Sequence, residues 1–202
     1  MATLFVDKLD PQSGTSLEIG SSGDTITVPS GATFNVAGTV GTGFTPGITE
    51  ADMWRLTTAF SGSVQPISSN WERCDEDTFA KIGTGMSVSS GIWSFPVTGL
   101  YHVIWNCSWQ LASAVSRYVY SELITTNDNA SYTERGVGWT SIFNGSGDTY
   151  TSSICSAFVN VSNVSNQKVK LGVNVANSSV DTRGSSTSNQ TWVTFIRLGD
   201  SQ

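Results

Sequence analysis

The clearest pattern of hydrophobic and polar positions lies in residues 100–109, which read LYHVIWNCSW. One face of this alternation carries large or apolar residues, namely Tyr101, Val103, Trp105, Cys107 and Trp109. The other face carries the polar residues His102, Asn106 and Ser108. Because successive side chains of a β-strand point to opposite faces, this period of two predicts a strand. We expect a central strand in which Val103, Trp105 and Cys107 are buried.

Further strands are predicted along the second part of the chain, separated by polar turns such as NDNAS, NGSGD and SNVSN. Their expected ranges are 91–97, 117–123, 149–161, 168–175 and 191–198. Pro96 favours a strand end or an edge strand, since proline cannot donate to a β-ladder. No stretch shows the period of 3.6 that is typical of helices. The pattern therefore predicts an all-β fold, a β-sandwich of the jelly-roll kind.

The first part of the chain has a different pattern. Residues 13–41 contain short apolar alternations, each followed by a glycine-containing corner: Leu17 and Ile19, Ile26 and Val28, and Phe34 and Val36. This predicts a short repeat of strand and turn. Six apolar side chains cannot offset an ordering cost of ~1–2 kcal/mol per residue, so we expect the segment to need neighbouring copies of the same chain. A flexible linker rich in glycine and serine is the alternative.

These patterns predict two parts: residues 1–45, a strand-and-turn segment that acts as a stalk or anchor, and residues 46–202, a jelly-roll head. The composition changes between them, since all seven tryptophans lie at or after Trp54. The region around 39–52 is the expected hinge, because it is rich in glycine and threonine.

Charge and composition exclude several classes of function. The chain of 202 residues has a net charge of −6, and its ten lysines and arginines are scattered, so no basic surface for phosphate contacts is expected. No run approaches the ~18 apolar residues of a membrane span. The start, MATLFVDKLD, lacks a cationic segment followed by an apolar stretch. We therefore expect no nucleic-acid binding, no membrane insertion, and synthesis in a cytoplasm.

No residue pattern points to catalysis, a metal or another cofactor. Cys74, Cys107 and Cys155 lack the close spacing of a metal or redox motif and are expected to be structural thiols, of which at least one is free within the chain. Cys107 and Cys155 lie in apolar strand patterns and are expected to be buried. The single histidine, His102, is expected in a strand or a subunit interface. Asp75, Glu76 and Asp77 form the one acidic run; without the spacing of a calcium loop they are expected in a solvated loop. Glu122 and Glu134 are the candidate carboxylates for the acid/base chemistry of a glycosidase, but no sequence pattern around them supports that role.

Three tryptophans lie outside the clearest strand patterns: Trp54, Trp71 and Trp139. Exposed aromatic side chains in polar loops give recognition surfaces their apolar contact area. Trp139 is the candidate for surface recognition, because Gly136, Gly138 and Ser141 around it suggest a loop near an apex of the head. Burial in a trimer interface is the alternative.

Residues 71–109 resemble the jelly-roll head of marine bacteriophage virion proteins, which is similar to the tumour necrosis factor and complement globular-head superfamily. The resemblance is carried by Trp71-Glu72-Arg73, by the turn from Lys81 to Met86, and by the segment from Phe95 to Tyr101 (FPVTGLY) before the long strand. In FPVTGLY the glycine comes one residue earlier than in the superfamily pattern. The last strand, TWVTFIRLGD, is also similar. The first part resembles the stalks of cyanophage and pelagiphage appendage proteins.

This resemblance implies a homotrimer with a ten-stranded head on a slender stalk, displayed on a virion. The expected function is that of a non-enzymatic structural protein, a fibre or knob that contacts other virion proteins and a host surface glycan. A capsid decoration protein that stabilises the head lattice and a lectin-like binding module are the alternatives.

Overall fold

The computed structural model describes residues 9, 11–35, 47–143 and 147–202. The chain divides into two units, Met1–Thr45 and Pro46–Gln202, and the second is called the head below. The described residues contain strands, turns and bends and no helix, in agreement with the all-β prediction. Within that part of the chain, no helix is long and apolar enough to cross a membrane.

The head contains twelve strands among its described residues. They are β1 (Ala51–Leu56), β2 (Phe60–Ser61), β3 (Trp71–Arg73), β4 (Ser87–Ser89), β5 (Ile92–Ser94), β6 (Gly99–Ala112), β7 (Ser116–Thr126), β8 (Tyr132–Ile142), β9 (Asp148–Val161), β10 (Lys168–Val175), β11 (Asp181–Thr182) and β12 (Trp192–Gly199). The expected strand over 91–97 is shorter, because β5 ends before Pro96. The structure adds β1, β3, β4 and β8, and the two-residue strands β2 and β11, which the sequence pattern does not predict. Strand β1 begins at Ala51, within the range expected as the hinge.

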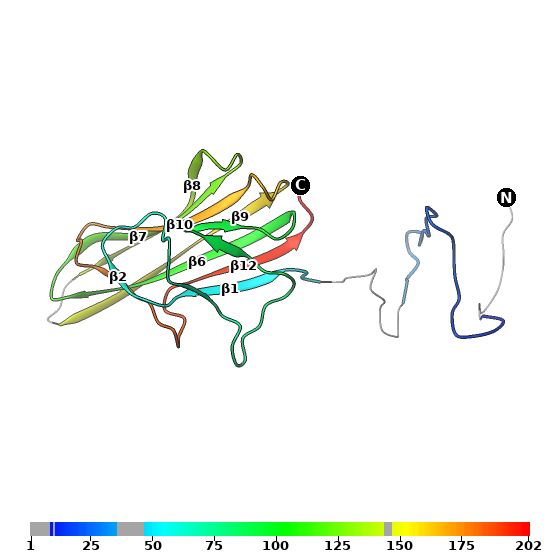
Figure 1. The fold of residues 1–202 in the computed structure, drawn as a ribbon, viewed down its shortest axis with the longest axis horizontal. Coiled ribbons are helices and arrows are strands. Elements are labelled where there is room, and N and C mark those ends of the chain that lie inside the picture. Colours follow the sequence, from blue (N-terminus) through cyan, green and yellow to red (C-terminus); the bar gives the residue numbers. More distant parts are fainter. Residues whose placement is uncertain (1–8, 10, 36–46, 144–146) are drawn as a thin grey trace. The chain divides into compact units, whose positions relative to one another are not determined.

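Two antiparallel sheets stack face to face to form a jelly-roll sandwich (Figure 1). The seven-stranded sheet has the order β2-β11-β6-β12-β1-β3, and β9 pairs with β6 on its other side. The five-stranded sheet has the order β4-β5-β10-β7-β8. The described head has twelve strands, two more than the ten that the resemblance implies, and the two shortest are β2 and β11.

The core lies on the inner face of β6, as the alternation predicts. Val103, Trp105, Cys107 and Trp109 are fully buried. The Trp105 indole donates a hydrogen bond to the Gly172 carbonyl of β10, at 3.3 Å, and so joins the two sheets. Each fully buried aromatic side chain of this kind removes about 150–250 Å² from water, which makes β6 the main source of the head's hydrophobic stabilisation.

Trp54 and Trp71 lie outside the clearest strand patterns of the sequence, but the structure places both in strands. They lie in β1 and β3 and pack edge-on against the buried Trp93 ring, with centroid distances of 5.3 Å and 5.1 Å. Trp71 also lies 5.7 Å from Trp105. The sequence gives no clear alternation here because β1 and β3 are short and lie toward one edge of the seven-stranded sheet. Both tryptophans therefore belong to the core.

Within residues 11–35, the first unit has the predicted turns but not the predicted strands. Backbone hydrogen bonds of 3.0 Å close turns from Ser21 to Asp24 and from Pro29 to Ala32. No strand is formed in residues 11–35; Val36 and the expected hinge up to residue 46 lie outside the described residues. The apolar side chains between the turns are exposed, among them Ile19, Ile26 and Phe34. A strand requires a hydrogen-bonding partner, and one copy of this unit offers none in its described part.

The burial of Trp105 predicts a large effect of its removal. Trp105→Ala should lower the free energy of unfolding by about 3–5 kcal/mol, because it deletes a fully buried aromatic side chain. The same substitution at Trp139, whose side chain is 62% exposed, is the matched control and should change it by less than ~1 kcal/mol. Chemical denaturation measures both. A loss below ~1 kcal/mol at Trp105 would contradict the core described above.

Candidate functional site

The seven-stranded sheet is apolar on both faces. Its open face, the side that points away from the core, has three cross-strand rows over β1, β12, β6 and β9. One row holds Ala51, Ile196, His102 and Phe158, the next Met53, Thr194, Ile104 and Ser156, and the third Arg55, Trp192, Asn106 and Ile154. Seven of these twelve side chains are apolar and one is charged. The chain covers part of this face itself, since Asn106 donates to the Gln190 carbonyl and Asn189 to the Met53 sulfur. The open face of an antiparallel sheet in water is normally polar, so the remainder has the composition of a covered surface.

Strand β9 adds a stripe of exposed apolar side chains to the open face. Tyr150, Ile154 and Phe158 are 61%, 58% and 67% exposed. Their spacing of four residues keeps them on one face of the strand. His102 packs against the stripe, with its ring centroid 4.9 Å from that of Phe158. The structure thus places the single histidine in a strand on the open face, beside an aromatic ring.

The charge on the open face is neutralised within the chain. The Arg55 guanidinium lies 2.7 Å from the Glu72 carboxylate and 3.8 Å from that of Glu76. Arg55 itself is almost fully buried. A buried guanidinium with a carboxylate partner requires no further counter-ion, so it does not prevent another apolar surface from covering this face.

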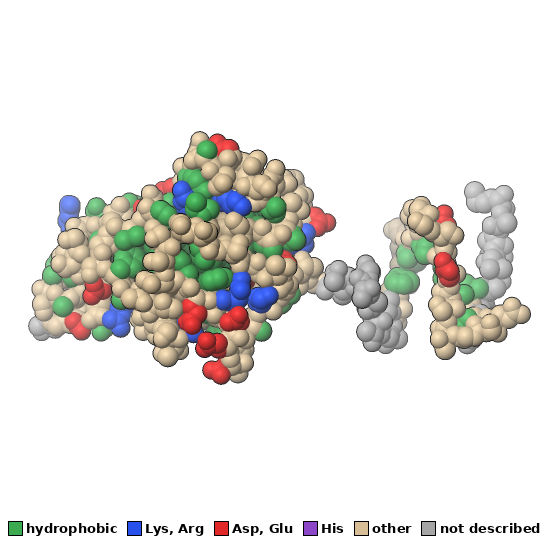
Figure 2. Space-filling view, viewed as in Figure 1, with side chains coloured by type: hydrophobic (Ala, Val, Ile, Leu, Met, Phe, Trp, Pro, Cys, Tyr) green, Lys and Arg blue, Asp and Glu red, His purple; other side chains and the backbone are tan. Residues whose placement is uncertain are grey.

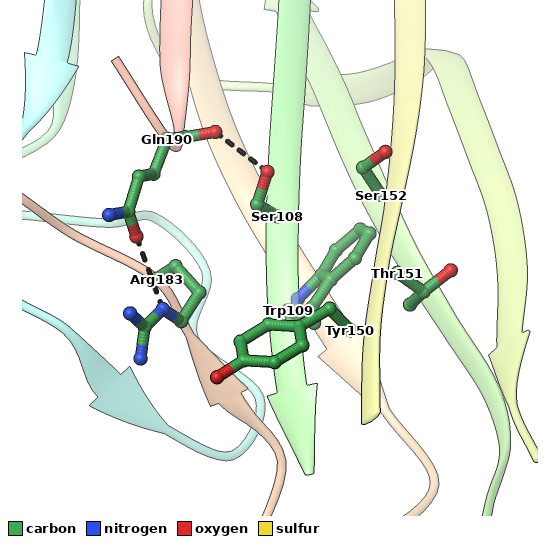
Figure 3. A pocket seen from close by; sticks show the side chains of 7 residues that line it. All are labelled: Ser108, Trp109, Tyr150, Thr151, Ser152, Arg183 and Gln190. Carbon is green, nitrogen blue, oxygen red and sulfur yellow. Dashed lines mark hydrogen bonds between the residues drawn. The ribbon is translucent and has the colours of Figure 1, made fainter. Parts of the chain in front are cut away.

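A hollow of about 430 Å³ borders the stripe where β6, β9 and the segment after β11 meet (Figure 3). It is lined by Ser108, Trp109, Tyr150, Thr151, Ser152, Arg183 and Gln190. Arg183 donates to the side-chain carbonyls of Gln190, at 3.1 Å, and of Gln110. Its guanidinium carbon lies 5.7 Å from the Tyr150 ring centroid. The hollow can accept hydroxyl or carboxylate groups at one end of the open face. The sequence gives no sign of it, because Arg183 lies in a polar segment without a motif.

Trp139 lies in β8 and not in a loop near an apex, so that part of the expectation is wrong. Gly136 and Gly138 face inward, where the backbone of β9 passes: a Cβ at Gly138 would lie 2.7 Å from the Ile154 carbonyl oxygen. The two glycines therefore allow strand packing instead of forming a turn. The alternation then turns Trp139 outward on the open face of the five-stranded sheet.

Two tyrosines of β7 hold the Trp139 ring in place. Its centroid lies 4.0 Å from that of Tyr120, with 33° between the ring planes, and 5.8 Å from Tyr118 in an edge-to-face contact. Tyr118 and Tyr120 are half-buried and 5.8 Å apart. These three rings are called the aromatic platform below. They form an exposed apolar surface whose orientation is fixed by ring-to-ring packing.

Glu122 and Glu134 lie on the neighbouring strands β7 and β8, but their environments differ. Glu134 is exposed, whereas Glu122 is 5% exposed. Burial raises the pKa of the Glu122 carboxyl, and the hydrogen bond that Gln65 donates to it opposes this shift. Gly172 lies between these two partners, where a Cβ would be 3.0 Å from Gln65 Cγ. Glu122 is thus the carboxylate acceptor of a small polar cluster at the surface of the five-stranded sheet.

The acidic run Asp75, Glu76 and Asp77 is exposed, as expected, and acidic side chains gather on the loop that projects from the head (Figure 2). Two buried carboxylates outside this acidic run hold the end of the loop in place. Glu50 accepts the Gly85 amide at 2.8 Å, and Asp52 accepts the Met86 amide at 2.7 Å. Within residues 9, 11–35, 47–143 and 147–202, no three histidine, cysteine or acidic side chains are arranged to hold a metal ion.

The three cysteines are free and buried. Burial raises the pKa of all three thiols, most strongly that of Cys107 in the centre of the core. Because the thiolate is the reactive form, the folded protein should react slowly with a thiol reagent at neutral pH, whereas the unfolded chain should react at once at three sites. The absorbance of released thionitrobenzoate measures both rates. Rapid labelling of the folded protein would contradict this assignment.

Comparison with known proteins identifies the fold and nothing finer. No protein-family model and no curated protein sequence matches the chain. The structure is similar to murine APRIL at pH 5.0, with a TM-score of 0.53 and 12% identity over 74% of this chain and 98% of that one. It is also similar to Eiger TNF from S. frugiperda, with a TM-score of 0.54 and 14% identity over 75% of this chain and 94% of that one. The head therefore has the jelly-roll fold of tumour necrosis factor-like proteins.

Proposed function

We propose that this protein is a non-enzymatic structural protein whose heads assemble into a homotrimer through the open face of the seven-stranded sheet, and that the trimer is displayed on a virion. The observation that carries the proposal is the apolar open face with the stripe of Tyr150, Ile154 and Phe158. Contiguous apolar surface of this kind is typical of interaction sites. A second copy of this chain is the occupant that the tumour necrosis factor-like fold favours.

Closed cyclic symmetry supports three copies over an open chain of subunits. In a ring, each head contributes one apolar patch and receives another, and no patch stays exposed. The short apolar alternations of the first unit support the same arrangement, because their exposed side chains would gain partners from two identical neighbours. The described residues of a single copy of this unit leave their apolar side chains exposed, and contacts with identical neighbours would bury them.

Display on a virion is supported by the resemblance of the first unit to phage stalks, and it makes the other virion proteins and a host surface glycan the further partners. Quantitative mass spectrometry of purified particles distinguishes the two structural roles. A fibre or knob should be present in a few tens of copies or fewer, whereas a capsid decoration protein should be present in hundreds. Absence of the protein from the particles would contradict display altogether.

A charge placed on the stripe should prevent assembly. Phe158 is 67% exposed in the single chain, so Phe158→Asp should leave the fold intact but bury a carboxylate at each subunit contact, which is strongly unfavourable. Phe79→Asp is the matched control, because Phe79 is 44% exposed on the loop after β3. Light scattering after size exclusion should give monomers for Phe158→Asp and trimers for Phe79→Asp. Trimers for both would contradict assembly through this face.

The head should assemble without the first unit. Removal of residues 1–45 leaves every row of the open face intact, so the remaining chain should fold and form trimers, with weaker association if the first unit adds contacts. Circular dichroism and sedimentation velocity measure folding and assembly separately. A folded but monomeric head would show that the first unit, and not the sheet face, holds the copies together.

A further inference from the structure

The aromatic platform lies on the opposite side of the head from the face that the proposed trimer would cover. Trp139, Tyr118 and Tyr120 belong to the open face of the five-stranded sheet, formed by β8 and β7. Trp139 is 62% exposed. A trimer built through the seven-stranded sheet therefore leaves three copies of the platform directed outward.

The platform is rigid, which reduces the entropy lost when a ligand binds. The Trp139 ring is packed against both tyrosines, and its strand is held close to β9 by the two inward-facing glycines. One face of an indole is thus presented to solvent in a fixed orientation. The face of an aromatic ring is electron-rich, so it attracts the polarised C–H groups on the flat side of a sugar ring.

A row of hydrogen-bonding groups continues from the platform across the sheet. Asn174 of β10 lies opposite Tyr120 and accepts a hydrogen bond from Ser63, at 3.4 Å. One step along the strands, Glu122 lies opposite Gly172 and accepts from Gln65. Since Gly172 has no side chain, the Gln65 side chain packs directly over it: a Cβ at Gly172 would lie 3.0 Å from Gln65 Cγ and 3.3 Å from a Glu122 carboxylate oxygen. An apolar ring surface beside such a row matches a ligand with one apolar face and hydroxyl groups at its rim.

The polar row decides between the occupants of this surface. An apolar protein surface laid over the platform would desolvate the amides of the exposed Gln65 and the half-buried Asn174 without supplying hydrogen-bonding partners, which is costly. A saccharide supplies hydroxyl donors instead. An acidic saccharide would bring its own carboxylates close to Glu122 and Glu134. One lysine, Lys170, lines the hollow beside Glu134, so the two carboxylates outnumber it, and like charges repel. The cluster therefore favours a neutral sugar.

We propose that the aromatic platform, with Asn174, Gln65 and the Glu122 carboxylate that holds Gln65, is a binding site for a neutral saccharide. Trp139 stacks against the flat face of one sugar ring, and the polar row receives its hydroxyl groups. This deepens the proposed function, because three outward sites on one trimer turn weak single contacts into strong attachment to a polysaccharide surface.

Calorimetric titration of the full-length protein tests the site. The probes are the neutral hexamers of glucose (maltohexaose and cellohexaose), of mannose and of N-acetylglucosamine, and an acidic hexamer of mannuronate that matches the mannose hexamer in its carbon skeleton. At least one neutral hexamer should bind. The mannose hexamer should bind more tightly than its acidic counterpart, and Glu122→Gln should reduce that difference. Failure of all four neutral hexamers to bind would overturn the proposal.

Trp139→Ala should weaken binding about tenfold or more, whereas Trp139→Phe, which keeps an aromatic ring, should recover part of the affinity. Phe79→Ala is the control, because Phe79 is an exposed aromatic residue on the loop after β3 and does not belong to the platform. This variant should bind the hexamers with the affinity of the unaltered protein. Unchanged binding by Trp139→Ala would contradict the assignment.

The oligomeric state of Trp139→Ala separates this proposal from the proposed assembly. It should equal that of the unaltered protein. If Trp139→Ala dissociates the trimer, the platform is a contact between copies and the saccharide site is refuted. If the unaltered protein is a monomer that still binds a neutral hexamer through Trp139, the trimer fails and the saccharide site remains.

Discussion

The ladder between β6 and β9 fixes the two faces of the head. These strands pair over fourteen residues, from Gly99 opposite Val161 to Ala112 opposite Asp148. The alternation along β6 puts Trp105 and Trp109 into the core, and the same register aligns Ile104 and His102 with the exposed side of β9. A shift by one residue would reverse both faces. The core and the candidate interface are therefore set by the same register.

The two open faces of the sandwich differ in chemistry. The seven-stranded sheet presents broad apolar rows, and Arg55, the charged residue of the three rows, is paired with Glu72 of β3 in the same sheet. The five-stranded sheet presents three packed rings beside Glu122 and two amides. Broad apolar area suits a permanent contact between copies, whereas a small platform with a polar border suits a ligand that exchanges with water. A trimer that covers the first face and exposes the second uses each surface according to its chemistry.

Much of the fold could be predicted from the sequence, because β6 and β10 have one buried face and alternate strictly. The sequence pattern does not predict strand β8, because Gly136 and Gly138 resemble turn residues. In the structure these two glycines make room for the backbone of β9. The packing of Trp54 and Trp71 could not be predicted because their partners, Trp93 and Trp105, are distant in sequence. The strands expected in the first unit are not formed by residues 11–35, whose local pattern needs hydrogen-bonding partners from elsewhere. The Arg183 hollow and the contact of Gln65 with Glu122 across Gly172 depend on tertiary packing, which no local spacing reveals.

Self-association through the seven-stranded sheet is the claim on which the functional account depends. Sedimentation equilibrium of the unaltered full-length protein, at several micromolar concentrations, tests it most directly. The account predicts a single species with three times the 21.5 kDa mass of one chain, and this mass should be the same at every concentration. A species of 21.5 kDa throughout that range would contradict it.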